Sequence, residues 1–394
     1  MVPSKSANKA SRLSFLLLVF KLFGLATFSA KAASTDLRLA RSRPGLLYNL
    51  VLGLTIGWTN LACLELPAQK QHALTLFSTI DSFEVLFGTT VALLILSFYC
   101  LRQRASIRLA RKLLGVATAS RALGLEREDG PVLSIGFHLL VFAVVLVSGL
   151  ACFGEHAHLI GSATRNLVVT WLILQYSLVT GFLASTFNSV NHALEELQES
   201  RGVLVSPGRL RFLSGLRDLH HLAIEVCRDA VEFYQLTILG CVAYMFVCLV
   251  VLLYFFIDPF IEGRIFFSLV EYCHFFMWLV SFAAAFVTLS RRVAQTGNQI
   301  DRTGVIVHRL MGSTLNQNIL EELKAFSMYL LHARLKFSAW ILFALDGSLV
   351  QSVSGSITTY LVILVQFELD FSNKRTYSAL NETLAGLPTD LQKI

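Results

Sequence analysis

The sequence predicts an all-α membrane protein with seven transmembrane helices, and three observations support this prediction. Hydrophobic residues make up 55% of the chain and charged residues 15%, well below the roughly 25% of soluble domains. Seven apolar stretches each approach the length of about 20 helical residues that crosses a hydrocarbon core. Basic residues gather in alternate connections between these stretches, which is the pattern that orients membrane helices.

The predicted spans follow one another along the chain as apolar runs between more polar connections. They cover residues 46–64, 82–101, 132–153, 167–187, 236–257, 265–290 and 340–367. An eighth apolar run at 13–30 imitates a signal peptide, but Lys21 interrupts its centre. We therefore expect this run to lie as an amphipathic segment on the inner membrane surface.

The distribution of Lys and Arg predicts which side of the membrane each end of the chain occupies. Of the 33 basic residues, 27 lie before the first span or after the second, fourth and sixth, and six lie elsewhere. The N-terminus is therefore expected inside and the C-terminus outside, the reverse of a G-protein-coupled receptor. The basic excess is thus attributed to loops that orient the spans, and no nucleic-acid partner is expected.

Two of the inner connections are long and carry apolar residues at helical spacing. These connections, residues 188–235 and 291–339, are expected to form a cytoplasmic helical anchor region that packs on itself or on neighbouring subunits. The predicted organisation is a cytoplasmic segment over 1–45, a seven-helix domain over 46–367 and an extracellular tail over 368–394.

The seventh span is expected to be a broken helix that lines a water-filled pore. Ser, Thr and Gly residues, all poor helix formers, crowd its middle between Ser352 and Thr359. Beyond them, helical spacing places Thr359, Ile363, Gln366 and Phe367 on one face. Ile363 and Phe367 would form an apolar gate, and Gln366 would line the path of hydrated cations. The alternative is that Gln366 bonds to a neighbouring helix and Phe367 anchors the span at the interface.

A second group of aromatic and polar residues is expected to form a ligand cavity in the outer half of the bundle. Spans four and six present such residues at helical spacing, and spans one, two and five add others. A cavity of this composition suits a small organic molecule. The candidates are Trp58, Asn60, Glu84, Thr170, Trp171, Gln175, Tyr254, Glu271, Tyr272, His274 and Trp278. For His274, packing in the core or pairing with Glu271 is the alternative.

No cofactor, metal or enzyme chemistry is expected from the sequence. The seven Cys residues lack the spacing of a metal site, and the Glu-His-Ala-His run at 155–158 is a weak candidate for a metal site. Cys63 and Cys152 fall at expected outer span ends, which leaves a disulfide between them open. Asp346 is expected to cap a helix or pair with a nearby basic residue rather than to bind an ion.

The C-terminal residues resemble a known receptor signature. Thr359 and Tyr360, five apolar residues, and then Gln366 and Phe367 match the Thr-Tyr-x5-Gln-Phe pattern of the insect gustatory receptors without a gap. The 27 residues after Phe367 depart from that family, whose members commonly end soon after the signature. Three further segments look like family features, at residues 187–191, 216–220 and 343–349.

The resemblance implies a ligand-gated, non-selective cation channel for taste, with four subunits around a pore that the last span lines. The implied partners are a small-molecule tastant, monovalent and divalent cations, membrane lipid and related receptors, in a homo- or heterotetramer at the plasma membrane of a sensory neuron. Sugar receptors of the family tend to carry Glu where Leu361 stands, which favours a non-sugar ligand. A metabotropic seven-helix receptor and a membrane transporter are the alternatives.

Overall fold

The computed structural model shows a bundle of long helices, and it describes most but not all of the chain. The described residues are 15–32, 37–69, 76–125, 156–199, 207–262, 269–314, 316–333, 335, 337–339, 343–345 and 347–385, with isolated positions between 136 and 147. The third predicted span, residues 132–153, therefore lies largely outside the described residues. So do Cys152 and Asp346, together with the side chains at 155–158.

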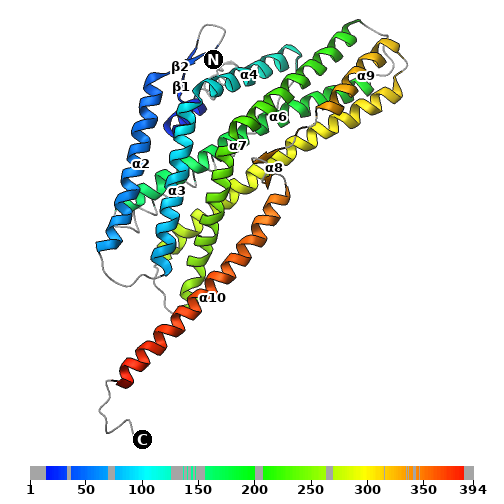
Figure 1. The fold of residues 1–394 in the computed structure, drawn as a ribbon. Helices are drawn as coiled ribbons and strands as arrows, with labels where there is room; N and C mark the ends of the chain where they lie inside the picture. The colour runs from blue at the N-terminus through cyan, green and yellow to red at the C-terminus, as the bar shows by residue number, and fades with distance from the viewer. Residues whose placement is uncertain are drawn as a thin grey trace.

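Long helices run side by side through the bundle (Figure 1). They are α2 (Arg43–Gln69), α3 (Leu76–Leu101), α6 (His156–Glu199), α7 (Pro207–Glu262), α8 (Leu269–Ser313) and α10 (Gly347–Ala385). Two shorter helices, α4 (Gln103–Ala122) and α9 (Gln317–His332), lie at the end of the bundle from which α10 points away. The last turn of α10 and the strands near the N-terminus lie at opposite ends of the molecule.

Five of the described helices are long and apolar enough to cross a membrane. Their candidate spans are Ser82–Leu101, Ala163–Gln198, Gly208–Ile257, Tyr272–Ser313 and Ser348–Phe367, and they coincide with or contain much of predicted spans two and four to seven. Predicted span one forms most of α2, whose large apolar side chains are exposed along one side, including Leu47, Leu54 and Trp58. Lipid would cover such a side in a membrane.

The helix that contains predicted span seven is unbroken, which corrects the expectation of a break near its middle. α10 runs as one helix from Gly347 to Ala385, so it also begins later than residue 340 and continues beyond Phe367. The Ser and Thr hydroxyls that suggested a break bond back into the helix, with Ser354 donating to the Val350 carbonyl and Thr359 to that of Gly355. Such back-bonding satisfies the hydroxyl inside an intact helix.

The fold is all-α as predicted, and two small sheets accompany the helices. Strand β1 (Phe28–Ala32) pairs antiparallel with β2 (Leu37–Arg41), and β3 (Ser338–Ala339) pairs with β4 (Phe343–Ala344). Among the described residues of the run at 13–30, the helix covers residues 15 to 22. Gly24 then turns the chain with a positive φ of 75°, and an added Cβ there would lie 2.5 Å from Leu96. A larger residue at this turn would be strained and would clash.

Polar contacts join α6 and α8 on the side expected to face the cytoplasm, near and beyond the ends of their apolar sections. Asn191 of α6 is fully buried and donates to the carbonyl oxygen of Gln299 at 2.9 Å and to its side-chain oxygen at 3.0 Å. Thr303 donates to Asn191 Oδ1 at 2.7 Å, and Thr296 donates to the Thr180 carbonyl at 3.1 Å. These bonds fix the two helices in register where the sequence predicts the anchor region, and α9 packs on α7 and α8 in the same region.

Helix α4 was not predicted from the sequence. The connection between predicted spans two and three was placed on the inner side by its basic charge, and no helix was expected in it. The buried residues of α4 include Ile107, Leu109 and Val116, which face the bundle, while Lys112 pairs with Asp229 of α7 at 2.6 Å. The apolar periodicity of this stretch was a usable signal.

The amide of Asn191 should contribute measurably to the stability of the inner bundle. Replacing Asn191 with Ala leaves the buried Thr303 hydroxyl without one of its partners and removes two bonds to Gln299. We expect a loss of about 1–3 kcal/mol in the free energy of unfolding. Thermal unfolding in detergent checks this, with the exposed Asn298→Ala of α8 as the matched control. Equal unfolding temperatures for the two variants would contradict the role given to Asn191.

Candidate functional site

An arginine lies buried between four helices near the expected outer side of the membrane. Arg165 of α6 is 2% exposed and makes an ion pair with Glu84 of α3 at 2.7 Å. Its guanidinium also donates to Asn60 of α2 at 2.5 Å and to the Tyr244 hydroxyl of α7 at 2.9 Å. Tyr244 in turn donates to the second carboxylate oxygen of Glu84. We call these four residues the Arg165 cluster.

The Arg165 cluster ties α2, α3, α6 and α7 together at one level of the bundle. Gly88, one turn from Glu84, makes room for it, since an added Cβ would lie 2.4 Å from the Tyr244 ring and 2.5 Å from Arg165 Cδ. A charge inside a membrane protein is costly unless another charge or a hydrogen bond compensates it. Here Glu84 supplies the opposite charge, and three residues accept from the guanidinium.

This burial corrects the count of basic residues in the sequence, in which Arg165 was one of the six placed outside the inner connections and was assigned to an outer loop. Helix α6 begins at His156, so Arg165 lies more than two turns inside it. The count could not reveal the position, because the positive-inside rule weighs charges near span ends without distinguishing exposed from buried ones. Two predicted ligand residues, Asn60 and Glu84, are thus held by a partner that was not predicted.

The other predicted ligand residues fall into separate groups. Trp171 stacks on Phe23 of the N-terminal segment, with ring centroids 4.9 Å apart, and Gln175 accepts from Tyr99 at 2.5 Å. Trp278 donates to His274 at 3.2 Å within α8. Among the remaining described members, Tyr254 packs against Phe255 in α7, Tyr272 packs against Phe256 of α7, and Trp58 is 75% exposed. Phe255 in turn contacts Phe275, the ring next to His274.

One member of this group has an unused polar atom. The Thr170 hydroxyl is buried and makes no hydrogen bond within the described part of the chain. A buried polar group in this state is a position where a bound molecule or water would be stabilised. The side chain of Glu271 falls outside the described residues, so its expected pairing with His274 stays a prediction.

Helix α10 presents two different faces. Val353, Ile357, Leu361 and Leu364 pack against the rest of the protomer, the last two beside Tyr254 and Phe255. The opposite face carries polar and small residues that are all exposed, namely Ser352, Gly355, Thr359 and Gln366. Ile363 and Phe367 flank this exposed face, at 39% and 54% exposure.

This arrangement makes α10 unlike the other candidate spans. Only 6% of its apolar window is buried inside the protomer, against 39–67% in the other four. Figure 1 shows the same separation, with α10 leaving the bundle and extending past the ends of its neighbours. A single protomer therefore leaves most of the surface of this helix exposed.

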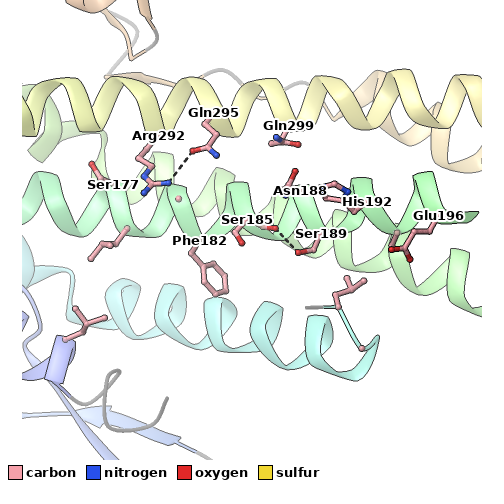
Figure 2. Close-up of a pocket in the computed structure, with 16 residues that line it drawn as sticks. Ser177, Phe182, Ser185, Asn188, Ser189, His192, Glu196, Arg292, Gln295 and Gln299 are labelled. Carbon is pink, nitrogen blue, oxygen red and sulfur yellow. Dashed lines mark hydrogen bonds between the residues drawn. The ribbon is translucent and has the colours of Figure 1, made fainter. Parts of the chain in front are cut away.

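A groove of about 680 Å³ lies between α6 and α8, in the part of the molecule expected near the inner membrane surface. Figure 2 shows Ser177, Ser185, Asn188 and Ser189 of α6 along it, with Arg292 of α8 at the end near Ser177. None of the predicted ligand or pore residues lines this groove. No local pattern in the sequence indicates this groove, because its lining comes from four separate segments of the chain.

The ion pair of the Arg165 cluster should dominate the stability of the outer bundle. Glu84→Ala leaves a buried guanidinium without its counter-charge, which we expect to lower the free energy of unfolding by about 3–5 kcal/mol. The double variant with Arg165→Met removes the stranded charge and should recover much of this loss. The exposed pair of Lys374 and Asp370 is the control, and Lys374→Ala should change little.

Thermal unfolding of the four proteins in detergent measures these differences. A Glu84→Ala variant as stable as the parent, or a double variant less stable than Glu84→Ala alone, would contradict the compensating role of Glu84.

Comparison with solved structures identifies the fold. An insect olfactory receptor, OR5 from Machilis hrabei, matches with a TM-score of 0.63 over 92% of this chain and 99% of that chain, at 10% identity. The same receptor in complex with eugenol matches with a TM-score of 0.56 over 91% of this chain and 98% of that chain, at 10% identity. The likeness supports several apolar helices arranged as in that receptor.

Comparison with curated sequences gives relatives in Drosophila melanogaster. The putative gustatory receptor 28b is 25% identical over 62% of this chain and 53% of its own length. The gustatory receptor for bitter taste 66a is 36% identical over 25% of this chain and 20% of its own length. The chain thus spans about half or less of the length of the curated relatives it matches.

The family itself follows from a match across nearly the whole chain. The model of the 7tm chemosensory receptors matches residues 13–371, which include every candidate residue named above. Together with the relatives, this match confirms the resemblance that the C-terminal signature indicates. The chain belongs to the 7tm chemosensory receptor family.

Proposed function

We propose that this receptor is a ligand-gated, non-selective cation channel for taste, in which α10 helices from four protomers surround one pore. It would lie in the plasma membrane of a sensory neuron, with the N-terminus inside and the C-terminus outside. The proposal rests mainly on one observation, the exposed polar face of α10.

The polar face of α10 is what an axial water path requires. Thr359 and Gln366 stand on the side of the helix opposite Ile357 and Leu361, which pack on the protomer. An amide facing lipid would lack hydrogen-bond partners, which is costly in a membrane. Water in a pore, or polar groups of a neighbouring protomer, would supply those partners. Between Ser352 and Phe367 this face carries no acidic residue, and Asp370, one turn beyond Gln366, pairs with Lys374, so weak selection among cations follows.

The gate is proposed at Ile363 and Phe367. Both side chains are largely exposed in the protomer and flank the polar face, so a ring of four copies would place apolar groups around the axis. A narrow apolar ring closes a pore by excluding water, without a solid plug. Ligand binding would open it only by favouring a conformation in which these rings move apart.

The ligand is proposed to bind in the outer half of the bundle, near α6. Thr170 offers an unused hydroxyl there, and Asn60 and Glu84 lie in the Arg165 cluster nearby in the same half. Leu361 and the similarity to a receptor for bitter taste favour a non-sugar compound. The ligand would shift the contacts among α2, α3, α6 and α7. Because α10 packs against α7, such a shift would reach α10.

The pore assignment is tested by currents from the expressed chain, screened against sugars, alkaloids and fatty acids. Phe367→Ala should weaken the apolar gate and raise the ligand-independent current several-fold, since water would remain in the constriction. Gln366→Leu should lower conductance by removing a polar group from the path. Val365→Ala, a neighbouring substitution away from the polar face, is the control.

Unchanged conductance, gating and ion preference in both Gln366→Leu and Phe367→Ala would refute the pore assignment. A response that requires G-protein signalling would instead support a metabotropic receptor. Saturable uptake of a substrate without current would support a transporter.

A further inference from the structure

The groove between α6 and α8 has features of a binding site that the proposed function does not use. It runs from Ser177 to Glu196 along α6, a length of about 28 Å at 1.5 Å per residue. Leu178 and Phe182 line the end nearer the membrane centre, and Leu16 of the N-terminal helix adds to this apolar wall. Hydroxyl and amide groups line the other part. The groove is therefore amphipathic along its length.

Ser177 supplies the first sign of a ligand. Its side chain is 2% exposed, it borders the groove, and its hydroxyl makes no hydrogen bond with any described residue. A buried hydroxyl usually has a partner, because leaving it unpaired costs free energy. A polar atom of a molecule in the groove would provide that partner.

Arg292 supplies the second sign. No described carboxylate forms an ion pair with it, and its guanidinium donates a hydrogen bond to the neutral Gln295 at 3.3 Å. Its side chain lies against Gly181, where an added Cβ would be 3.3 Å from Arg292 Cδ and 3.4 Å from Nε. The glycine thus lets the guanidinium lie close to α6 within the groove, next to the Ser177 end shown in Figure 2.

The position along the helices favours a lipid. Gly181 lies within the last two turns of predicted span four, and Arg292 comes two residues after the end of predicted span six. Both therefore stand where phosphate groups of the inner leaflet are expected. Basic pockets between membrane helices on the cytoplasmic side are typical binding sites for lipid headgroups.

We propose that this groove binds one phosphatidylinositol molecule of the inner leaflet. Arg292 binds the phosphodiester, Ser177 donates to an ester oxygen of the glycerol, and an acyl chain lies along Leu178 and Phe182. The inositol ring meets the hydroxyl and amide groups of Ser185, Asn188 and Ser189. The groove has one arginine at one end, hydroxyl and amide groups along it, and His192 and Glu196 at the other end. This lining matches a single phosphate and a hydroxyl-rich ring better than a polyphosphorylated headgroup, which needs several basic residues and would be repelled by the Glu196 carboxylate.

The test measures lipid binding directly and does not depend on channel activity. Purified full-length receptor, stripped of lipid in detergent, is titrated with dioctanoyl phosphatidylinositol and followed by native mass spectrometry. Arg292→Gln should weaken binding about tenfold through loss of the charge-assisted bonds. Arg291→Gln is the matched control, because Arg291 is the exposed neighbour with the same charge and does not line the groove.

Ser177→Ala separates binding from folding. Its hydroxyl has no partner within the described protein, so the substitution should leave thermal stability unchanged while weakening lipid binding. Equal binding by Arg292→Gln and Arg291→Gln would overturn the proposal. So would inorganic phosphate that displaces the lipid at similar concentration, or equal binding of dioctanoyl phosphatidylcholine or phosphatidylinositol bisphosphate. Failure of the channel assay would leave this result unaffected.

Discussion

The structure depends on one constraint: a polar or charged side chain inside a membrane span needs a partner. The Arg165 cluster meets it within the protomer, because Glu84, Asn60 and Tyr244 surround the guanidinium and join four helices. Helix α10 does not meet it within the protomer, because Gln366 points away from the bundle. The same constraint therefore stabilises the outer bundle and is the reason for the proposed assembly around α10.

The Arg165 cluster and α10 share one neighbour, helix α7, which suggests how ligand binding and gating would be connected. α7 carries Tyr244 of the Arg165 cluster and also packs against α10, with the rings of Phe246 and Tyr360 5.7 Å apart. A ligand that shifts α7 against α6 would act on α10 through contacts that already exist. The anchor helices, held by Asn191 and Thr303, would stay fixed while the outer parts move.

The sequence predicted the features that depend on local composition. The apolar runs gave the positions of most spans, and the Thr-Tyr-x5-Gln-Phe signature gave the family. Prediction from the sequence failed for features that depend on hydrogen bonds or ion pairs, which composition does not reveal. Poor helix propensity suggested a break near Ser354, but the hydroxyl bonds back to Val350 within an unbroken helix. Arg165 looked like a loop charge, because its partner Glu84 is 81 residues away in the chain.

The most direct test of the account is whether water reaches Gln366. The Gln366→Cys variant is treated with a charged, membrane-impermeant thiol reagent while the ligand holds the channel open, with the parent chain controlling for its own cysteines. The account predicts rapid block of the current at position 366 and none for Leu364→Cys, which packs inside the protomer. Block at position 364 with none at position 366 would show that the polar face does not line the path.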